Sequence, residues 1–281
     1  MLFIPQGFIA PPIAELDDTD KDLDVNILAV LPTKCKIASV VQGASYFALS
    51  HRVEAILGDG TKKTYFLKDL KGDIGKDMAK GEFEGLKALH AIIPSNTPQP
   101  IPHGTYAKDP NRHFFLCDFH EMKDDMSSTE RSVAAVAELH EKSDSLTGKF
   151  EFHCTTHAGN HPMQTSWCES WEEFFSRQLR EVVELAAGPS SLACAMAICG
   201  MEMWVWMWRL MNQICTIRVR DMHTTSEPVE DYDDRIALYA LRNNITVSAQ
   251  WPHNKSTRKL AIEEMRHLVA KYPNGIDGFK G

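Results

Sequence analysis

Residues 63–82 read KTYFLKDLKGDIGKDMAKGE, and this stretch joins a predicted strand to a predicted helix. The strand pattern runs up to Lys68, and helical spacing follows it. Met78 and Leu86 lie on one stripe of the predicted helix, and Glu82 falls inside that stripe rather than on the polar face. A carboxylate that faces inward needs a cationic partner, so this helix is expected to pack against a positive charge.

The flanking sequence extends this strand and helix in both directions. From Lys36 the pattern changes to alternating strands, and the turn Gly58-Asp59-Gly60 predicts a hairpin between 53–57 and 63–68. Prolines between 94 and 102 end the helix and predict a connecting segment, after which 113–119 predicts another strand. Strands come first and helices later, which predicts an α+β fold with a small β-rich lobe and a mostly helical lobe. The other helices are expected over 22–31, 131–142, 166–187, 232–243 and 256–271.

The order of these elements indicates a nucleotide site. In kinases, a strand lysine binds nucleotide phosphates and a glutamate on the next helix holds its ammonium group, roles that Lys68 and Glu82 fit. Gly43-Ala44-Ser45 precedes the hairpin, where a loop covering the phosphates would lie. Asp118-Phe119-His120 would form the hinge that presents backbone groups to adenine. Each feature alone is an ordinary surface or turn feature, but the ordered set predicts a kinase N-lobe.

Further motifs carry a family resemblance. They include YFLK (65–68), MAKGEFEGL (78–86), FFLCDF (114–119), AELH (137–140) and WEEFF (171–175), together with 159–167, 230–242 and 263–273. Over about 25–189 and 229–273 the chain resembles the fructosamine/ketosamine-3-kinase family, and its fungal protein-ribulosamine 3-kinase-like members above all. The resemblance implies a protein-kinase-like fold and ATP-dependent, Mg²⁺-assisted phosphorylation of ribulosamine or fructosamine on glycated proteins or small ketosamines. It also implies that Lys68 binds the ATP phosphates and that Glu82 orients Lys68.

The same resemblance sets the expected organisation. Residues 1–35 would be an N-terminal extension, 36–122 a kinase-like N-lobe with its hinge, and 123–281 a helical but incomplete C-lobe. The chain is expected to be a monomer.

The expected catalytic segment is missing from this sequence. The family carries its base and magnesium ligands in a His-Gly-Asp-Leu-Trp-x-Gly-Asn stretch, followed by a later Asp and a Tyr-x-His-x-Glu element. None of these motifs occurs here, so no catalytic residue and no metal ligand can be named in this chain. Residues 191–228 form instead an aberrant segment dense in Met, Cys and Trp.

The genetic code suggests a cause. Back-translating Met196 to Met203 with each codon started one nucleotide earlier allows His-Gly-Asp-Leu-Trp-Tyr-Gly-Asn, with both glycines forced. The same shift across Asp221 to Ser226 allows Tyr-Ala-His-Asn-Glu, with the alanine forced. Two family motifs can thus be recovered in one alternative reading frame. This favours the hypothesis that misplaced splice junctions displaced the reading frame between about residues 191 and 228. An uninterrupted in-frame genomic sequence would support this hypothesis, whereas transcripts with only the present junctions would oppose it.

Other interpretations remain open. Met196 to Trp208 could be a buried helix or an apolar surface for a partner, and the chain could be a non-catalytic nucleotide-binding or scaffold pseudokinase. His153-Cys154, His157 and His161 suggest zinc, but their irregular spacing favours ordinary loop residues.

Composition excludes several classes of function. A formal charge of −8 and a pI near 5.8 argue against a nucleic-acid-binding surface, which needs clustered Lys and Arg. The apolar residues 1–5 have no positive n-region, so no signal peptide is expected. The run 192–211 contains Glu202 and Arg209, which argues against a membrane span. Seven cysteines without secretory features predict reduced thiols and a cytoplasmic location.

Overall fold

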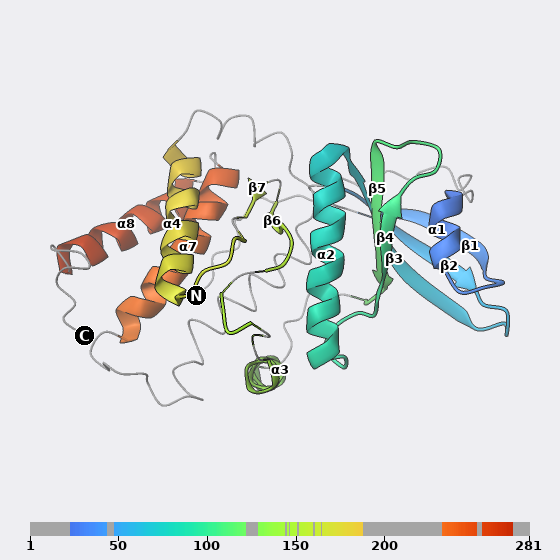
Figure 1. Cartoon of the computed structure of the whole chain (residues 1–281), viewed down its shortest axis with the longest axis horizontal. Helices are drawn as coiled ribbons and strands as arrows, with labels where there is room; N and C mark the ends of the chain where they lie inside the picture. The colour runs from blue at the N-terminus through green and yellow to red at the C-terminus, as the bar shows by residue number, and fades with distance from the viewer. Residues whose placement is uncertain are drawn as a thin grey trace. The chain divides into compact units, whose positions relative to one another are not determined.

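The computed structural model describes residues 23–43, 48–121, 129–187 except 144, 146, 151, 160 and 164, and then 232–251 and 255–271. The chain divides into two compact units, the first ending at Asp124 and the second beginning at Asp125. Each unit has its own hydrophobic core. Figure 1 shows the helices and strands of both units. The aberrant segment 191–228 lies outside the described residues.

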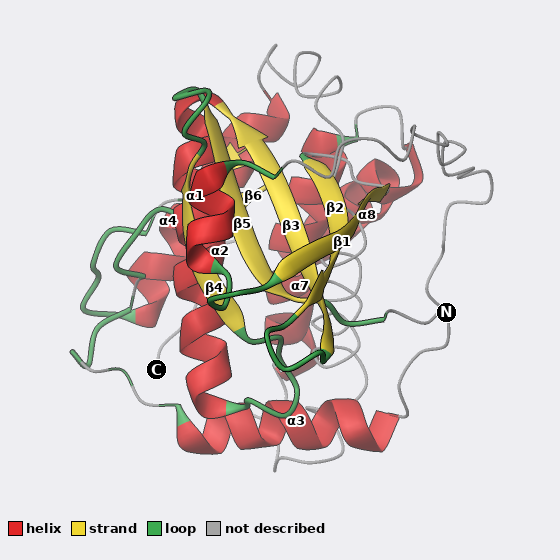
Figure 2. Cartoon of the chain, turned by 90° about the vertical axis from the view of Figure 1, so that its right-hand side faces the viewer, coloured by secondary structure: helices red, strands yellow, loops and turns green. Residues whose placement is uncertain are grey.

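A five-stranded antiparallel sheet forms the first unit, in the order β1-β2-β3-β5-β4 (Figure 2). The predicted hairpin around Gly58-Asp59-Gly60 joins β2 to β3, and the predicted helix follows β3 directly. The elements are α1 Val25–Val30, β1 Lys36–Gly43, β2 Leu49–Ile56, β3 Lys62–Lys71, α2 Gly72–Ile92, β4 Pro100–Thr105 and β5 Arg112–Asp118.

The two faces of this sheet bury different cores. Tyr65 and Leu67 point to one face, where they pack with Val53, Leu116 and Ile27 of α1. The alternate residues of β3 point to the other face, because successive side chains of a strand alternate. Figure 1 shows the sheet nearly edge-on, with α2 on one side and α1 on the other. The core beneath α2 comprises Leu70, Met78, Ala79, Phe115 and Cys117.

Backbone geometry places α2 close to the end of β3. Gly72 has a φ of 72°, which is unfavourable for residues with a Cβ, and its N–H donates to the carbonyl of Asn111 over 2.9 Å. A Cβ on Gly75 would lie 2.9 Å from the carbonyl carbon of Leu70. The helix therefore starts at Gly72, directly after β3, and packs on the sheet.

The edge strand β4 was not predicted, because its prolines indicated a connecting segment rather than a strand. Proline lacks an N–H, but an edge strand has one side without a hydrogen-bonded neighbour, so it tolerates proline. The register shifts between Ile101 and Gly104. A Cβ on Gly104 would lie 2.7 Å from the ring of Phe114, so glycine permits the close approach of β4 to β5.

Asp24 ties α1 to the loop between β4 and β5. Its carboxylate caps the helix by accepting from the N–H of Asn26 at 2.9 Å, and it accepts from the N–H groups of Ala107 at 2.8 Å and Lys108 at 3.1 Å. Burial of the carboxylate opposes ionisation, but these backbone donors outweigh it and hold the pKa of Asp24 below its ordinary value of 3.8. The carboxylate therefore stabilises the fold in its ionised form.

Replacing Asp24 with alanine is expected to lower the free energy of unfolding by about 2 kcal/mol, because a helix cap and two charge-assisted hydrogen bonds are lost. A depressed folded pKa contributes stability above the unfolded pKa, and this contribution disappears as the pH falls through the folded pKa. Urea unfolding should thus separate the two proteins at pH 7 and bring them together well below pH 3.8. An equal difference at both pH values would contradict this role of the charge.

Helices dominate the second unit. Val182, Leu241, Ile245 and Ala261 form its core, and Trp171 begins an aromatic cluster with Phe174, Phe175 and Tyr239. The expected helix over 166–187 starts at Trp171, and the one over 232–243 extends to Gln250. The elements are α3 Thr129–Lys142, β6 His157–Ala158, β7 His161–Pro162, α4 Trp171–Ala187, α7 Tyr232–Gln250 and α8 Lys255–Lys271.

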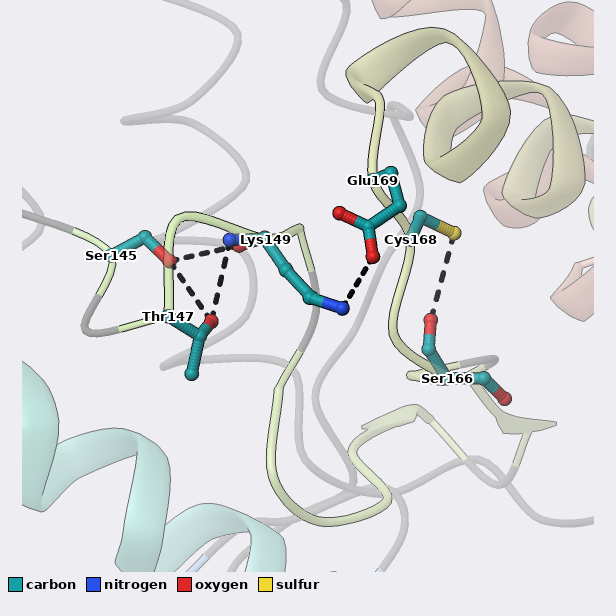
Figure 3. Close-up of polar contacts among 6 residues, drawn as sticks. All are labelled: Ser145, Thr147, Lys149, Ser166, Cys168 and Glu169. Atoms are coloured by element: carbon teal, nitrogen blue, oxygen red, sulfur yellow. Dashed lines mark hydrogen bonds and ion pairs between the residues drawn. The ribbon is translucent and has the colours of Figure 1, made fainter.

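Polar contacts organise the loop that precedes α4 (Figure 3). Phe150 and Cys168 form an antiparallel bridge, and the side chains of Lys149 and Glu169 next to it form an ion pair. The hydroxyl of Ser145 donates to the carbonyl of Lys149 over 2.9 Å. The bridge brings the ring of Phe150 to 5.8 Å from that of Trp171, and so the loop packs on the first turn of α4.

No helix in the described part of the chain is long and apolar enough to cross a membrane. The apolar run 192–211 is outside that part.

Candidate nucleotide site

Lys68 lies in the middle of β3, on the face that packs against α2. It pairs across the sheet with Ser50 of β2 and Phe115 of β5. Phe66 and Leu70 flank it on the same face and belong to the core beneath α2. Only 5% of the Lys68 side chain is exposed, so its ammonium group is held by its surroundings rather than by water.

Glu82 of α2 supplies the counter-charge. Its Oε1 accepts from Nζ of Lys68 at 2.5 Å, and 17% of its side chain is exposed. The helical spacing predicted that the carboxylate of Glu82 faces inward, and in the structure this carboxylate contacts Lys68. The second oxygen, Oε2, is buried without a hydrogen-bond partner among the described residues. Because one carboxylate oxygen binds only one of the three ammonium protons, Lys68 retains donors for an anion.

A cross-strand row connects Lys68 to the end of β1. Gly43 pairs with Ser50, and Ser50 pairs with Lys68. A Cβ on Gly43 would lie 3.0 Å from Oγ of Ser50, so the absence of a side chain at Gly43 leaves room for the hydroxyl of Ser50. Adjacent strands are about 4.8 Å apart, which places the backbone of Gly43 about 10 Å from that of Lys68. Ala44 and Ser45, predicted with Gly43 as a phosphate-covering loop, lie outside the described residues.

The predicted hinge continues from β5. The N–H of Asp118 donates to the carbonyl of Gln99 at 3.0 Å, and the N–H of Phe119 donates to the carbonyl of Thr64 at 3.1 Å. Both N–H groups are therefore already hydrogen-bonded to neighbouring backbone carbonyls. A nucleotide base bound at residues 118–120 would hydrogen-bond to the other backbone groups of this segment. His120 follows and is exposed. An open depression of about 400 Å³ is lined by Arg52, Lys62, Lys63, Thr64, Asp118, Phe119, His120 and Glu121.

Arg52 is a residue of this depression that the sequence patterns did not single out. Its guanidinium carbon lies 5.0 Å from the centroid of the Phe119 ring, and Nη2 lies 3.1 Å from a carboxylate oxygen of Glu54. The predicted strand 53–57 began one residue too late to include Arg52. In β2, period-2 alternation places Arg52 and Glu54 on one strand face. Only the register with β3 reveals that this is the face of Lys68.

Cys117 is buried beneath α2. Burial of the thiol, together with the nearby carboxylates of Glu82 and Asp118, raises the pKa of Cys117 to about 12. A thiol with this pKa is protonated near pH 7 and is a poor nucleophile.

The described residues do not supply a metal centre. No group of three or more His, Cys, Asp or Glu side chains among them could hold a metal ion, and this search includes His153, Cys154, His157 and His161. The segment 191–228, where the family motifs are missing from the sequence, lies outside the described ranges.

Comparison with known proteins bears on the family and the fold. The family model described as Fructosamine kinase matches residues 46–190, just over half of the chain. A candidate fructosamine-3-kinase from Thermobifida fusca YX-ER1 is 14% identical with a TM-score of 0.53, and the match covers 88% of this chain and 99% of that one. A second candidate, from Haemophilus somnus 129PT, is 15% identical with a TM-score of 0.52, covering 81% and 91%. Curated proteins gave no match. These likenesses confirm the expected α+β, protein-kinase-like fold.

Proposed function

Because the chain belongs to the fructosamine kinase family, we propose that its first unit binds ATP, with the phosphates at Lys68 and the base beside the hinge segment 118–120. The observation that carries this proposal is the 2.5 Å ion pair between Lys68 and Glu82 on a largely buried sheet face. A buried ammonium fixed by one carboxylate is oriented before any ligand arrives, which lowers the entropic cost of binding a phosphate.

The family assignment supports a phosphotransferase that acts on an alcohol group. We propose the ketosamine class as acceptor, meaning the sugar portion of ribulosamine or fructosamine on glycated proteins or small amines. Such a transfer needs a group that positions the attacking hydroxyl and ligands for the magnesium of MgATP. The present sequence has neither family motif for these roles, so binding without appreciable turnover is the activity proposed for this chain.

A non-catalytic scaffold is the second candidate. The absence of the catalytic motifs favours it, and so does the separate core of each unit, since these cores do not depend on those motifs. Both candidates bind nucleotide without appreciable turnover, and they differ in whether the chain also binds a ketosamine, which makes them separable by a binding assay with a ribulosamine or fructosamine adduct.

Thermal unfolding of the purified protein tests the proposal. A ligand that binds only the folded state stabilises it, by about 2.7 kcal/mol when its concentration is one hundred times Kd. ATP should therefore raise the transition temperature in a saturable manner, and AMP should raise it less because it offers fewer phosphates to Lys68. A cooperative transition that ATP does not move would contradict the proposed function.

A further inference from the structure

Arg52 shares a sheet face with Lys68. Directly paired residues of an antiparallel ladder point to the same side, and Arg52 pairs with Phe66 while Ser50 pairs with Lys68. Phe66 and Lys68 are two positions apart on β3, so they also point to one side. Arg52 is therefore one strand over and two positions along from the proposed phosphate-binding ammonium, about 7 Å in the strand direction.

The side chain of Arg52 reaches across β3 to the hinge segment. Thr64 of β3 is hydrogen-bonded to Phe119 by backbone groups, so Phe119 continues β5 beside Thr64. The guanidinium carbon of Arg52 lies 5.0 Å from the centroid of the Phe119 ring, and Glu54 binds its Nη2 at 3.1 Å. The guanidinium is thus fixed between an acid on its own strand and an aromatic ring two strands away.

Two features indicate that this arrangement can receive a ligand. The depression of about 400 Å³ has Arg52 and Phe119 in its lining. The Arg52 side chain is 42% exposed despite its contacts with Glu54 and Phe119, so part of the guanidinium remains open to a ligand. A planar cation backed by an aromatic ring is a surface on which planar, electron-rich rings stack.

We propose that Arg52, supported by Phe119 and Glu54, stacks on the base of the bound nucleotide and makes the site prefer purines over pyrimidines. The inference rests on the proposed function, because it takes Lys68 as the phosphate-binding group. Arg52 and Lys68 lie on one face of the sheet, so a nucleotide that extends along β3 can contact both side chains. Purines present a larger π face than pyrimidines, so stacking favours them.

Substitutions can separate the contribution of the positive charge of Arg52 to nucleotide binding from the contribution of its planar guanidinium. Arg52→Lys keeps the positive charge but removes the planar group, and Phe119→Leu removes the supporting ring while keeping an apolar side chain. Arg258→Lys, on exposed Arg258 of α8 in the second unit, is the matched control for the arginine change.

Binding of ATP, CTP and inorganic tripolyphosphate to each protein, measured by calorimetry, tests the proposal. Arg52→Lys should weaken ATP binding about tenfold, the loss of one good cation–π contact, and should reduce the preference for ATP over CTP. Its binding of tripolyphosphate should stay within about twofold, because the charge is retained. Phe119→Leu should change base preference in the same direction, and Arg258→Lys should bind like the unmodified protein.

The outcomes separate this inference from the proposed function. If the unmodified protein binds ATP and Arg52→Lys keeps the same ATP affinity and base preference, stacking by Arg52 is wrong while nucleotide binding stands. Equal losses of ATP and tripolyphosphate would also overturn stacking, since they would mark a charge effect. If the unmodified protein binds neither ATP nor tripolyphosphate, both proposals fail.

Discussion

Replacing Lys68 with methionine is expected to weaken ATP binding by about ten- to a hundredfold, because charge-assisted hydrogen bonds to phosphate contribute about 1.5–3 kcal/mol. The same change should lower the free energy of unfolding by about 3 kcal/mol, since Glu82 is then left without its cation in a largely buried position. Calorimetric titration with ATP and urea unfolding measure the two effects.

A double variant separates these two losses. Lys68→Met with Glu82→Met replaces the whole ion pair by apolar side chains, and such replacements of buried pairs are often neutral or stabilising. The double variant should therefore regain most of the stability lost by Lys68→Met but none of the ATP affinity. Recovery of ATP binding in the double variant would show that the lysine acts through stability alone. Unchanged ATP affinity in the single variant would remove Lys68 from the site.

The second large effect concerns turnover. The purified 281-residue protein, incubated with MgATP and a ribulosamine adduct of lysine, should transfer phosphate at least about 10⁴-fold more slowly than an active member of the family. The physical reason is the absence of the motifs that position the attacking hydroxyl and bind magnesium. Positioning and electrostatic stabilisation supply most of the rate acceleration in phosphoryl transfer.

Transfer of ³²P from ATP to the adduct measures this rate, and the Lys68→Met variant controls for contaminating kinases. Robust transfer that disappears in the Lys68→Met protein would contradict the prediction and locate a working catalytic group in this chain. Sequencing of transcripts across residues 191–228 tests the displaced-frame hypothesis independently of any assay.

Local patterns predicted the central part of the first unit. Helical spacing in 72–92 placed Glu82 inward, and the strand pattern ended near Lys68, so their pairing could be inferred from one short stretch. The edge strand β4 could not be predicted from sequence, because its prolines are typical of a connecting segment. Only its pairing with β5 in the structure shows that these prolines lie on an edge strand. Arg52 was missed for a related reason, since its contact with Phe119 spans three strands and depends on register.

The direct pairing of Ser50 with Lys68 makes the site sensitive to the length of the turn at Gly58-Asp59-Gly60. Side chains alternate with a period of two, so a slip of one residue would send the lysine into the apolar layer beneath α1 and turn Leu67 or Asp69 toward Glu82. An insertion of one residue in this turn should therefore weaken nucleotide binding, whereas changes in its composition that preserve its length should be tolerated.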